Sequence, residues 1–290
     1  MTLRDIDYDT ITEAVGQAYA GTNDERLREI MTALIPRLHD FIREIKLTPE
    51  EWRTTMNFLL EAAMNCNEQR NDFILLSDLL GVSALVDLID GRDDEGATAA
   101  TLLGPFYVPG QPDVENGADL IKDNPGERVV VKGQVRSTSG GPLPGAVIEV
   151  WQNGPNGLYT VQDPDQPEDN LRCTLRADAN GEYSFSTVKP VSYKVREDGA
   201  GGKLVRASGW HSWRPAHIHV IISADGHKRH VSQIFDANDP YIDQDAVFGV
   251  RADLAVPFDR EPRSEELERY AHVQQPFHVI DMDWVLAPTS

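Results

Sequence analysis

The chain has 290 residues, of which 40% are hydrophobic and 26% charged, a balance typical of soluble globular proteins. Its formal net charge is −20, so it repels phosphate backbones, and we expect no nucleic-acid partner. No run of eighteen apolar residues is present, so we expect no membrane insertion. Only Cys66 and Cys173 occur, too few for a disulfide framework or a thiolate metal cage. No basic-then-apolar leader opens the sequence, and we expect a reduced, cytoplasmic setting.

The first hundred residues have helical periodicity. Residues 25–45 carry apolar side chains at three-to-four spacing, although Pro36 should kink or split this helix. Thr48 and Glu51 have the spacing of a capping box, which predicts that a second helix begins there. Shorter helices are expected over 73–80, ending at Gly81, and over 84–89, capped by Ser83.

After about residue 127 the apolar period changes to two, which is typical of strands. Strands are expected over 128–135, 146–151, 171–177, 182–186, 216–223, 230–235 and 277–286. The Gly-rich, charged stretch 189–212 is expected to be a long loop. The sequence therefore predicts an α+β chain, with an all-helical N-terminal domain (1–100) followed by an antiparallel β-sandwich domain (101–290).

Two histidines stand two residues apart in a predicted strand. Residues i and i+2 of a strand face the same side, so His217 and His219 can converge on one metal ion. Judged alone, such a pair more often has a structural or solvent-exposed role. The residues around the pair decide between these interpretations.

These residues resemble the intradiol ring-cleaving dioxygenases of the catechol 1,2-dioxygenase group. The resemblance covers nearly the whole chain and is most specific in Trp213–His219 (WRPAHIH) together with two upstream tyrosines. Further matching segments are Leu103–Tyr107, Gly141–Ala146, Glu149–Gln152, Gly157–Tyr159, Arg176–Asp178, Gly181–Tyr183 and Lys189–Tyr193.

Carried over position by position, the resemblance implies that Tyr159, Tyr193, His217 and His219 hold one Fe(III) ion per chain. Phenolate oxygens are hard, strongly donating anions that favour ferric iron, whereas a carboxylate with two histidines would suggest a ferrous centre. A ferric ion also favours ionisation of a tyrosine, whose ordinary pKa is about 10.

The resemblance further implies the chemistry of the site. An aromatic diol or triol binds through adjacent oxygens, Tyr193 accepts a substrate proton, and O2 is incorporated to give a muconate-type dicarboxylic acid. Arg214 is the implied catalytic cation, because a fixed positive charge favours developing negative charge. The implied substrate-binding residues are Leu75, Asp78, Leu102, Gly104, Pro105, Phe106, Val195 and Gln233.

Two of these residues bear on the choice of diol. Asp78 resembles the acidic residue of hydroxyquinol 1,2-dioxygenases, where it could accept a hydrogen bond from a third ring hydroxyl. Phe106 is likewise the hydroxyquinol-like residue. The predicted substrate is hydroxyquinol (benzene-1,2,4-triol), and catechol or a substituted catechol is the alternative.

Three further points stay open at this stage. The family tends to have prolines after Tyr193, where this chain has Lys-Val-Arg-Glu-Asp (194–198). Arg196 would either favour a more anionic substrate or pair with an acid at the pocket mouth.

The resemblance implies a homodimer formed through the helical domain, with room for bound lipid. The strand motifs are also shared with non-catalytic transthyretin-like sandwiches, which would not need the tyrosines and histidines.

Overall fold

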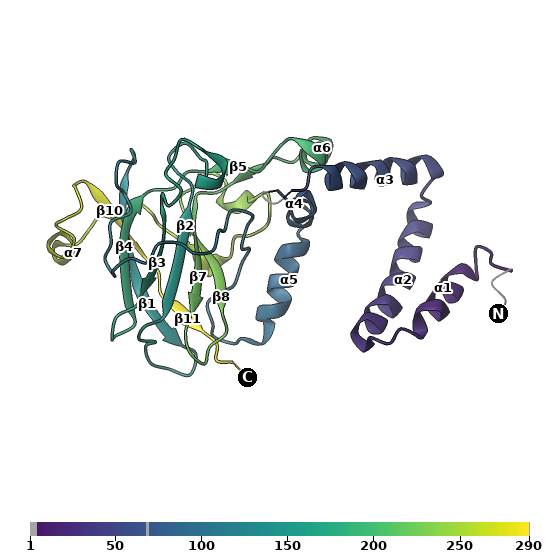
Figure 1. The fold of residues 1–290 in the computed structure, drawn as a ribbon, viewed down its shortest axis with the longest axis horizontal. Coiled ribbons are helices and arrows are strands. Elements are labelled where there is room, and N and C mark those ends of the chain that lie inside the picture. Colours follow the sequence, from purple (N-terminus) through teal and green to yellow (C-terminus); the bar gives the residue numbers. More distant parts are fainter. Residues whose placement is uncertain (1–4, 68–69, 290) are drawn as a thin grey trace. The chain divides into compact units, whose positions relative to one another are not determined.

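The computed structural model describes residues 5–67 and 70–289, and the chain forms two compact units, Met1–Leu60 and Glu61–Ser290. The first unit holds α1 (Ile11–Ala20), α2 (Glu25–Ile45) and most of α3 (Pro49–Met64) (Figure 1). The division expected near residue 100 stays a prediction, since compactness alone separates the chain at residue 60.

The predicted helix signals of the first unit are only partly followed. Glu51 accepts the backbone N–H of Thr48 at 2.8 Å, which confirms the capping box of α3. Pro36 lies inside α2 without splitting it. Most of the apolar side chains of α2 are exposed, namely Leu27, Ile30, Leu34, Leu38, Phe41, Ile42 and Ile45. The single chain therefore leaves an apolar helix face uncovered.

The second unit opens with two short helices and one 3-10 turn. These are α4 (Asp72–Leu79), α5 (Val82–Asp90) and η1 (Gly91–Asp93). Gly81 separates α4 from α5 with a left-handed φ of 68°, as expected. Ser83 lies inside α5, where its hydroxyl bonds to that of Ser77, so the predicted Ser83 cap is wrong. None of the helices in the described parts of the chain has the length and apolarity needed to cross a bilayer.

The strands of the second unit form two larger sheets and one short hairpin. The first sheet contains β1 (Arg128–Ser137), β4 (Glu182–Val188), β10 (Phe277–Asp281) and β11 (Trp284–Leu286). The second contains β2 (Val147–Gln152), β3 (Arg172–Arg176), β7 (His217–Ser223), β8 (His230–Asp236) and β9 (Ala255–Val256). The hairpin pairs β5 (Tyr193–Lys194) with β6 (Trp213–Arg214).

The expected purely antiparallel sandwich is wrong in one respect, because both larger sheets are mixed. β1 pairs antiparallel with β4 but parallel with β10 and β11, and β8 pairs parallel with β9. The predicted strand 277–286 is in fact two strands, which pair with successive segments of β1. A parallel pair needs a long crossover, and here the C-terminal segment returns to β1 from far along the chain.

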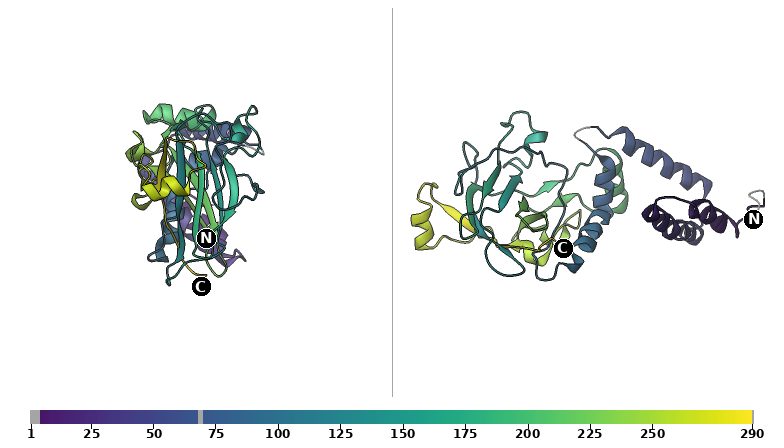
Figure 2. Two further views of the ribbon diagram at one scale, coloured as in Figure 1. Left: turned by 90° about the vertical axis from the view of Figure 1, so that its left-hand side faces the viewer. Right: turned by 60° about the horizontal axis from the view of Figure 1, so that its bottom comes forward.

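The core lies between the two larger sheets (Figures 1 and 2). Alternate residues of each strand enter it, such as Val129 and Val131 of β1 facing Ile218 and Val220 of β7. The opposite face of β7 is consequently free to carry other side chains. Remaining elements of this unit are η2 (Thr160–Gln162), α6 (Gly199–Ser208), η3 (Ile242–Gln244), η4 (Ala252–Leu254) and α7 (Ser264–Arg269).

The stretch 189–212 is not the loop that its glycines suggested, since it contains β5 and α6. Gly201 and Gly202 are buried in α6, and neighbouring atoms leave no room for a side chain at either position. A Cβ on Gly201 would lie 2.7 Å from a methyl carbon of Leu75, and one on Gly202 would overlap the carbonyl oxygen of Glu197. Tight packing, which local propensity does not reveal, explains these glycines.

A buried polar link within the second unit gives the first prediction. Tyr183 of β4 donates its hydroxyl to the Met282 carbonyl at 2.7 Å and accepts the indole N–H of Trp284 at 2.8 Å. Tyr183→Phe removes the hydrogen-bond partner of both buried groups, so we expect the free energy of unfolding to fall by about 2–4 kcal/mol. Urea denaturation followed by tryptophan fluorescence measures this. Tyr19→Phe, at a side chain 41% exposed, should change stability by less than about 0.5 kcal/mol. Equal losses in both variants would contradict it.

Candidate active site

The two predicted histidines lie on the face of β7 that points away from the core. β7 runs between β2 and β8, with His219 opposite Trp151 on one side and opposite Gln233 on the other. Because side chains alternate, Ile218 enters the core while His217 and His219 share the opposite face. Both imidazoles are buried, at 2% and 1% exposure.

Three donor atoms converge at this face. The hydroxyl of Tyr159 lies 3.2 Å from Nε2 of His217 and 3.1 Å from Nε2 of His219, and the two Nε2 atoms are 3.1 Å apart. Tyr159 is 2% exposed and stands at the N-terminal end of η2. The three atoms thus form a nearly equilateral, water-shielded triangle.

Surrounding groups fix the orientation of the rings. Nδ1 of His217 lies 2.7 Å from the Pro215 carbonyl and therefore carries the proton, which leaves its Nε2 lone pair for the triangle. The ring of Trp151 stacks on His219 at a centroid distance of 4.7 Å. Gly104, with φ of 72°, brings the chain over His219, since a Cβ there would lie 3.1 Å from the imidazole carbon Cε1.

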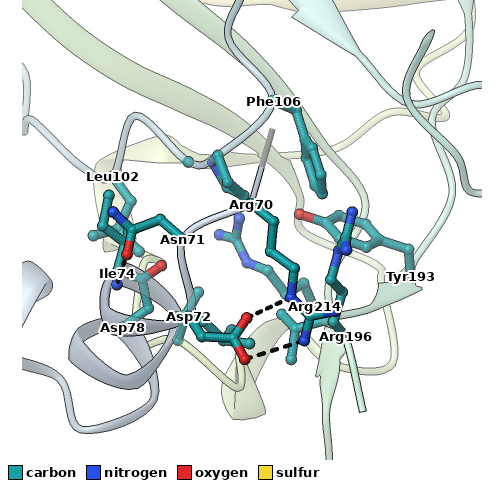
Figure 3. Close-up of a pocket in the computed structure, with 15 residues that line it drawn as sticks. Arg70, Asn71, Asp72, Ile74, Asp78, Leu102, Phe106, Tyr193, Arg196 and Arg214 are labelled. Atoms are coloured by element: carbon teal, nitrogen blue, oxygen red, sulfur yellow. Dashed lines mark hydrogen bonds and ion pairs between the residues drawn. The ribbon is translucent and has the colours of Figure 1, made fainter. Parts of the chain in front are cut away.

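Tyr193 joins the cluster from the β5–β6 hairpin. In this hairpin Tyr193 pairs with Arg214, which brings both residues to the site together. The Tyr193 ring centre is 5.6 Å from that of Tyr159 and 5.6 Å from that of His217. Its hydroxyl points into the adjacent pocket (Figure 3).

Arg214 is a fixed, buried charge beside this cluster. Its Nη1 lies 3.2 Å from Nε2 of His217, and its Nε and Nη2 donate to the two carboxylate oxygens of Asp245 at 3.0 and 3.1 Å. Nη2 also donates to Gln233 at 2.9 Å. Burial favours loss of the proton, but the Asp245 charge outweighs it and raises the pKa of Arg214. The guanidinium therefore stays charged.

Burial disfavours the charged forms of all three groups of the triangle, the phenolate of Tyr159 and the imidazolium forms of the two histidines. Burial and the neighbouring Tyr193 raise the pKa of Tyr159 well above its ordinary value, against the opposing effect of Arg214. Burial and the charge of Arg214 lower the pKa values of His217 and His219 well below theirs. Neutral imidazoles are the form that binds metals, and a metal cation favours the phenolate.

The donor set fits a single metal ion. Ligand atoms bound at about 2.1 Å to one ion lie about 3.0–3.4 Å from one another, which matches the triangle. In the described parts of the chain, at this face as elsewhere, no cluster of three or more His, Cys, Asp or Glu side chains could hold a metal. The tyrosine oxygens are therefore essential to this donor set.

A pocket beside the cluster receives most of the predicted substrate-binding residues (Figure 3). Those that line it are Leu75, Asp78, Leu102, Gly104, Pro105, Phe106 and Val195, together with Tyr193 and Arg214. Gln233 does not line the pocket, because its amide lies between Arg214 and the Leu102 carbonyl. Phe106 stacks on Tyr159 at a ring distance of 4.4 Å.

Asp78 is the acidic group expected to select the substrate. It is only 7% exposed and lies on α4, within the pocket lining. Burial raises its pKa, while a hydrogen bond with Ser83 and the charge of Arg214 lower it in part. A buried carboxyl of this kind gains from a hydrogen-bonding ligand.

Sequence reasoning missed several residues that complete the pocket. These are Arg70, Asn71, Asp72, Ile74 and Val247, as well as Asp245 behind Arg214. The backbone N–H of Gly249 donates to Asp245 at 2.9 Å, so the loop after η3 presents this carboxylate. No short motif links an acid to an arginine 31 residues earlier, and only the fold brings them together.

Comparisons with known proteins agree with this geometry. The family model described as Dioxygenase matches residues 102–277, and Catechol dioxygenase N terminus matches residues 24–98. A hydroxyquinol 1,2-dioxygenase of Rhizobium sp. (strain MTP-10005) is 43% identical over 91% of this chain and 90% of its own length.

Solved structures give the same result. Hydroxyquinol 1,2-dioxygenase from Pseudomonas putida DLL-E4 superposes with a TM-score of 0.90 at 36% identity, covering 97% of this chain and 99% of the other. Catechol 1,2-dioxygenase from Acinetobacter sp. ADP1 has a TM-score of 0.84 at 28% identity, covering 98% and 95%. The chain is an enzyme of the intradiol ring-cleavage dioxygenase family, within the catechol 1,2-dioxygenase group.

Proposed function

We propose that this enzyme cleaves hydroxyquinol between its adjacent hydroxyls, giving 3-hydroxy-cis,cis-muconate or its tautomer maleylacetate. Both atoms of one O2 enter the product, so the reaction needs no other reductant. The similarity to hydroxyquinol 1,2-dioxygenases over most of the chain supports this substrate. Membership of an enzyme family sets aside the transthyretin-like alternative.

One non-haem Fe(III) ion per chain is the proposed cofactor, held by Tyr159, Tyr193, His217 and His219. The triangle of Tyr159, His217 and His219 and the nearby Tyr193 ring support this ligand set. When bound, the ferric ion would draw electron density from the coordinated diol and make the ring reactive towards O2.

The protein's own groups then have distinct tasks. As a phenolate, Tyr193 would take up a proton from one substrate hydroxyl, because its side-chain oxygen points into the pocket. Arg214 supplies a fixed positive charge where negative charge develops on the ring and its oxygens. Apolar side chains of Leu75, Leu102 and Phe106 exclude water around the ring.

The single observation that carries the choice of hydroxyquinol is the buried carboxyl of Asp78 in the pocket lining. With the adjacent hydroxyls near the donor triangle, a third hydroxyl can hydrogen-bond to this carboxyl. Catechol has no group to offer there, and the buried carboxyl would stay without that partner.

For assembly, we propose a homodimer formed through the helical region (1–100), with the β region (101–290) catalytic. The uncovered apolar face of α2 supports this, because such a face is buried in a stable assembly. The same face would suit bound lipid.

A test of the proposed ligands combines metal analysis with absorption spectroscopy. We expect about one iron per chain and a visible tyrosinate-to-ferric charge-transfer band, which shifts when hydroxyquinol is added without O2. Tyr159→Phe should lose most of the iron and the band, because one of the three donor atoms of the triangle is removed. Tyr107→Phe, at a tyrosine bonded to Glu149, should keep both. A colourless wild-type protein with stoichiometric zinc would refute the iron centre.

Substrate choice is tested at Asp78. Asp78→Ala should lower kcat/KM for hydroxyquinol relative to catechol by about 5- to 150-fold, because the hydrogen bond to the third hydroxyl is worth about 1–3 kcal/mol. Asp90→Ala, which changes an exposed acid nearby, is the control and should leave the ratio unchanged. An unaltered ratio in Asp78→Ala, measured by steady-state kinetics, would show that this carboxyl does not select the substrate.

The support of Arg214 is tested at Asp245. Asp245→Asn keeps the shape of the side chain but leaves the buried guanidinium without its counter-charge. The free energy of unfolding should therefore fall by about 3–5 kcal/mol. We also expect a lower kcat, since Arg214 is then free to reorient. Asp243→Asn, at an exposed acid in the same segment, should be neutral in denaturation and turnover assays. Wild-type stability and kcat in Asp245→Asn would contradict this role.

A further inference from the structure

The pocket lining carries three arginines, and the proposed reaction uses only one of them. Arg70, Arg196 and Arg214 line it, although the whole chain has a net charge of −20. The acids of the lining are Asp72 and Asp78. The hydrogen-bond partners of each arginine show which of the three is free to bind a ligand.

Arg70 is fully engaged by two acids. Its Nε donates to Oδ1 of Asp72 at 2.6 Å and its Nη2 to Oδ2 at 3.1 Å, while Nη1 donates to Asp198 at 2.6 Å. The Asp72 side chain is 1% exposed and the Arg70 side chain 13%. The two carboxylates therefore more than balance the charge of Arg70, and the three side chains join α4 to the start of α6.

Arg214 is equally occupied, by both oxygens of Asp245 and by Gln233. Asp78 has no hydrogen bond or ion pair with Arg196, and the arginine whose charge acts on its carboxyl is Arg214. Asp72, Asp198 and Asp245 are thus bonded to Arg70 or Arg214, and none of the three is hydrogen-bonded to Arg196.

Arg196 itself has no hydrogen bond or ion pair with any residue in the described ranges 5–67 and 70–289. The adjacent acid, Glu197, accepts hydrogen bonds from Lys194 and Ser212 instead. The next acid, Asp198, is bonded to Arg70, which is the main cause of its lowered pKa, and Arg196 acts on it only through space. In Figure 3 the Arg196 side chain runs along the pocket wall beside Tyr193. Arg196 is half-buried and lines the pocket, with no bonded partner among the residues that the structure describes.

We propose that Arg196 is a specificity residue that admits aromatic diols bearing a carboxylate on the ring, in addition to the neutral triol. This inference rests on the proposed function, since it concerns the same pocket. A guanidinium forms two parallel hydrogen bonds with a planar carboxylate, and such a pair is strong where water is partly excluded. The unpaired charge also attracts anionic rings to the pocket.

The test compares hydroxyquinol with 2,3- and 3,4-dihydroxybenzoate on the iron-loaded enzyme. Dissociation constants are measured by calorimetry without O2, and kcat/KM with O2. Arg196→Gln should weaken binding of at least one dihydroxybenzoate tenfold or more, and that of hydroxyquinol less than threefold. Arg196→Lys keeps the charge but not the planar fork, and should give an intermediate loss.

A matched control removes a positive charge outside the pocket. Lys203→Gln, at an exposed cation of α6, should change none of these constants by more than twofold. Equal changes for charged and neutral diols in Arg196→Gln, or no change for either, would overturn the role of Arg196 while hydroxyquinol turnover stands. A wild-type enzyme that cleaves neither hydroxyquinol nor catechol would instead overturn the proposed function.

Discussion

The position of β7 between β2 and β8 is the constraint on which the site depends. Two imidazoles can share one face only because a strand alternates its side chains, and a slip of one residue would send both into the core. Pairing on both edges prevents such a slip, since His219 is held opposite Trp151 and Gln233. The hydrophobic residues between and beyond the histidines fix the same register from the other face.

A second constraint is the buried charge of Arg214. A guanidinium inside a protein is stable only with a counter-charge and satisfied donors, and Asp245 and Gln233 provide both. These partners come from different strands and loops, so the charge also ties the β5–β6 hairpin to β8 and to the loop after η3. Tyr193 belongs to that hairpin, and its placement therefore shares this support.

Much of the fold and site follows from the sequence, for identifiable reasons. Strand periodicity located most strands, and the i, i+2 spacing of His217 and His219 placed both on one face. Two predictions were wrong because they depend on contacts with distant residues. These are the purely antiparallel sheet, where β1 pairs parallel with the C-terminal strands, and the loop in the glycine-rich stretch that forms α6. The Asp245 carboxylate was missed because nothing local marks it.

The proposed metal donors and the walls of the pocket come from different parts of the chain. His217 and His219 sit on a central strand whose other face is packed core, so few exchanges are tolerated there. Much of the wall comes instead from α4, the segment around Gly104 and the turn that follows Tyr193, which lie outside the two large sheets. Substitutions in these connecting segments can therefore change the ring that the pocket accepts without disturbing the strand that carries the two histidines.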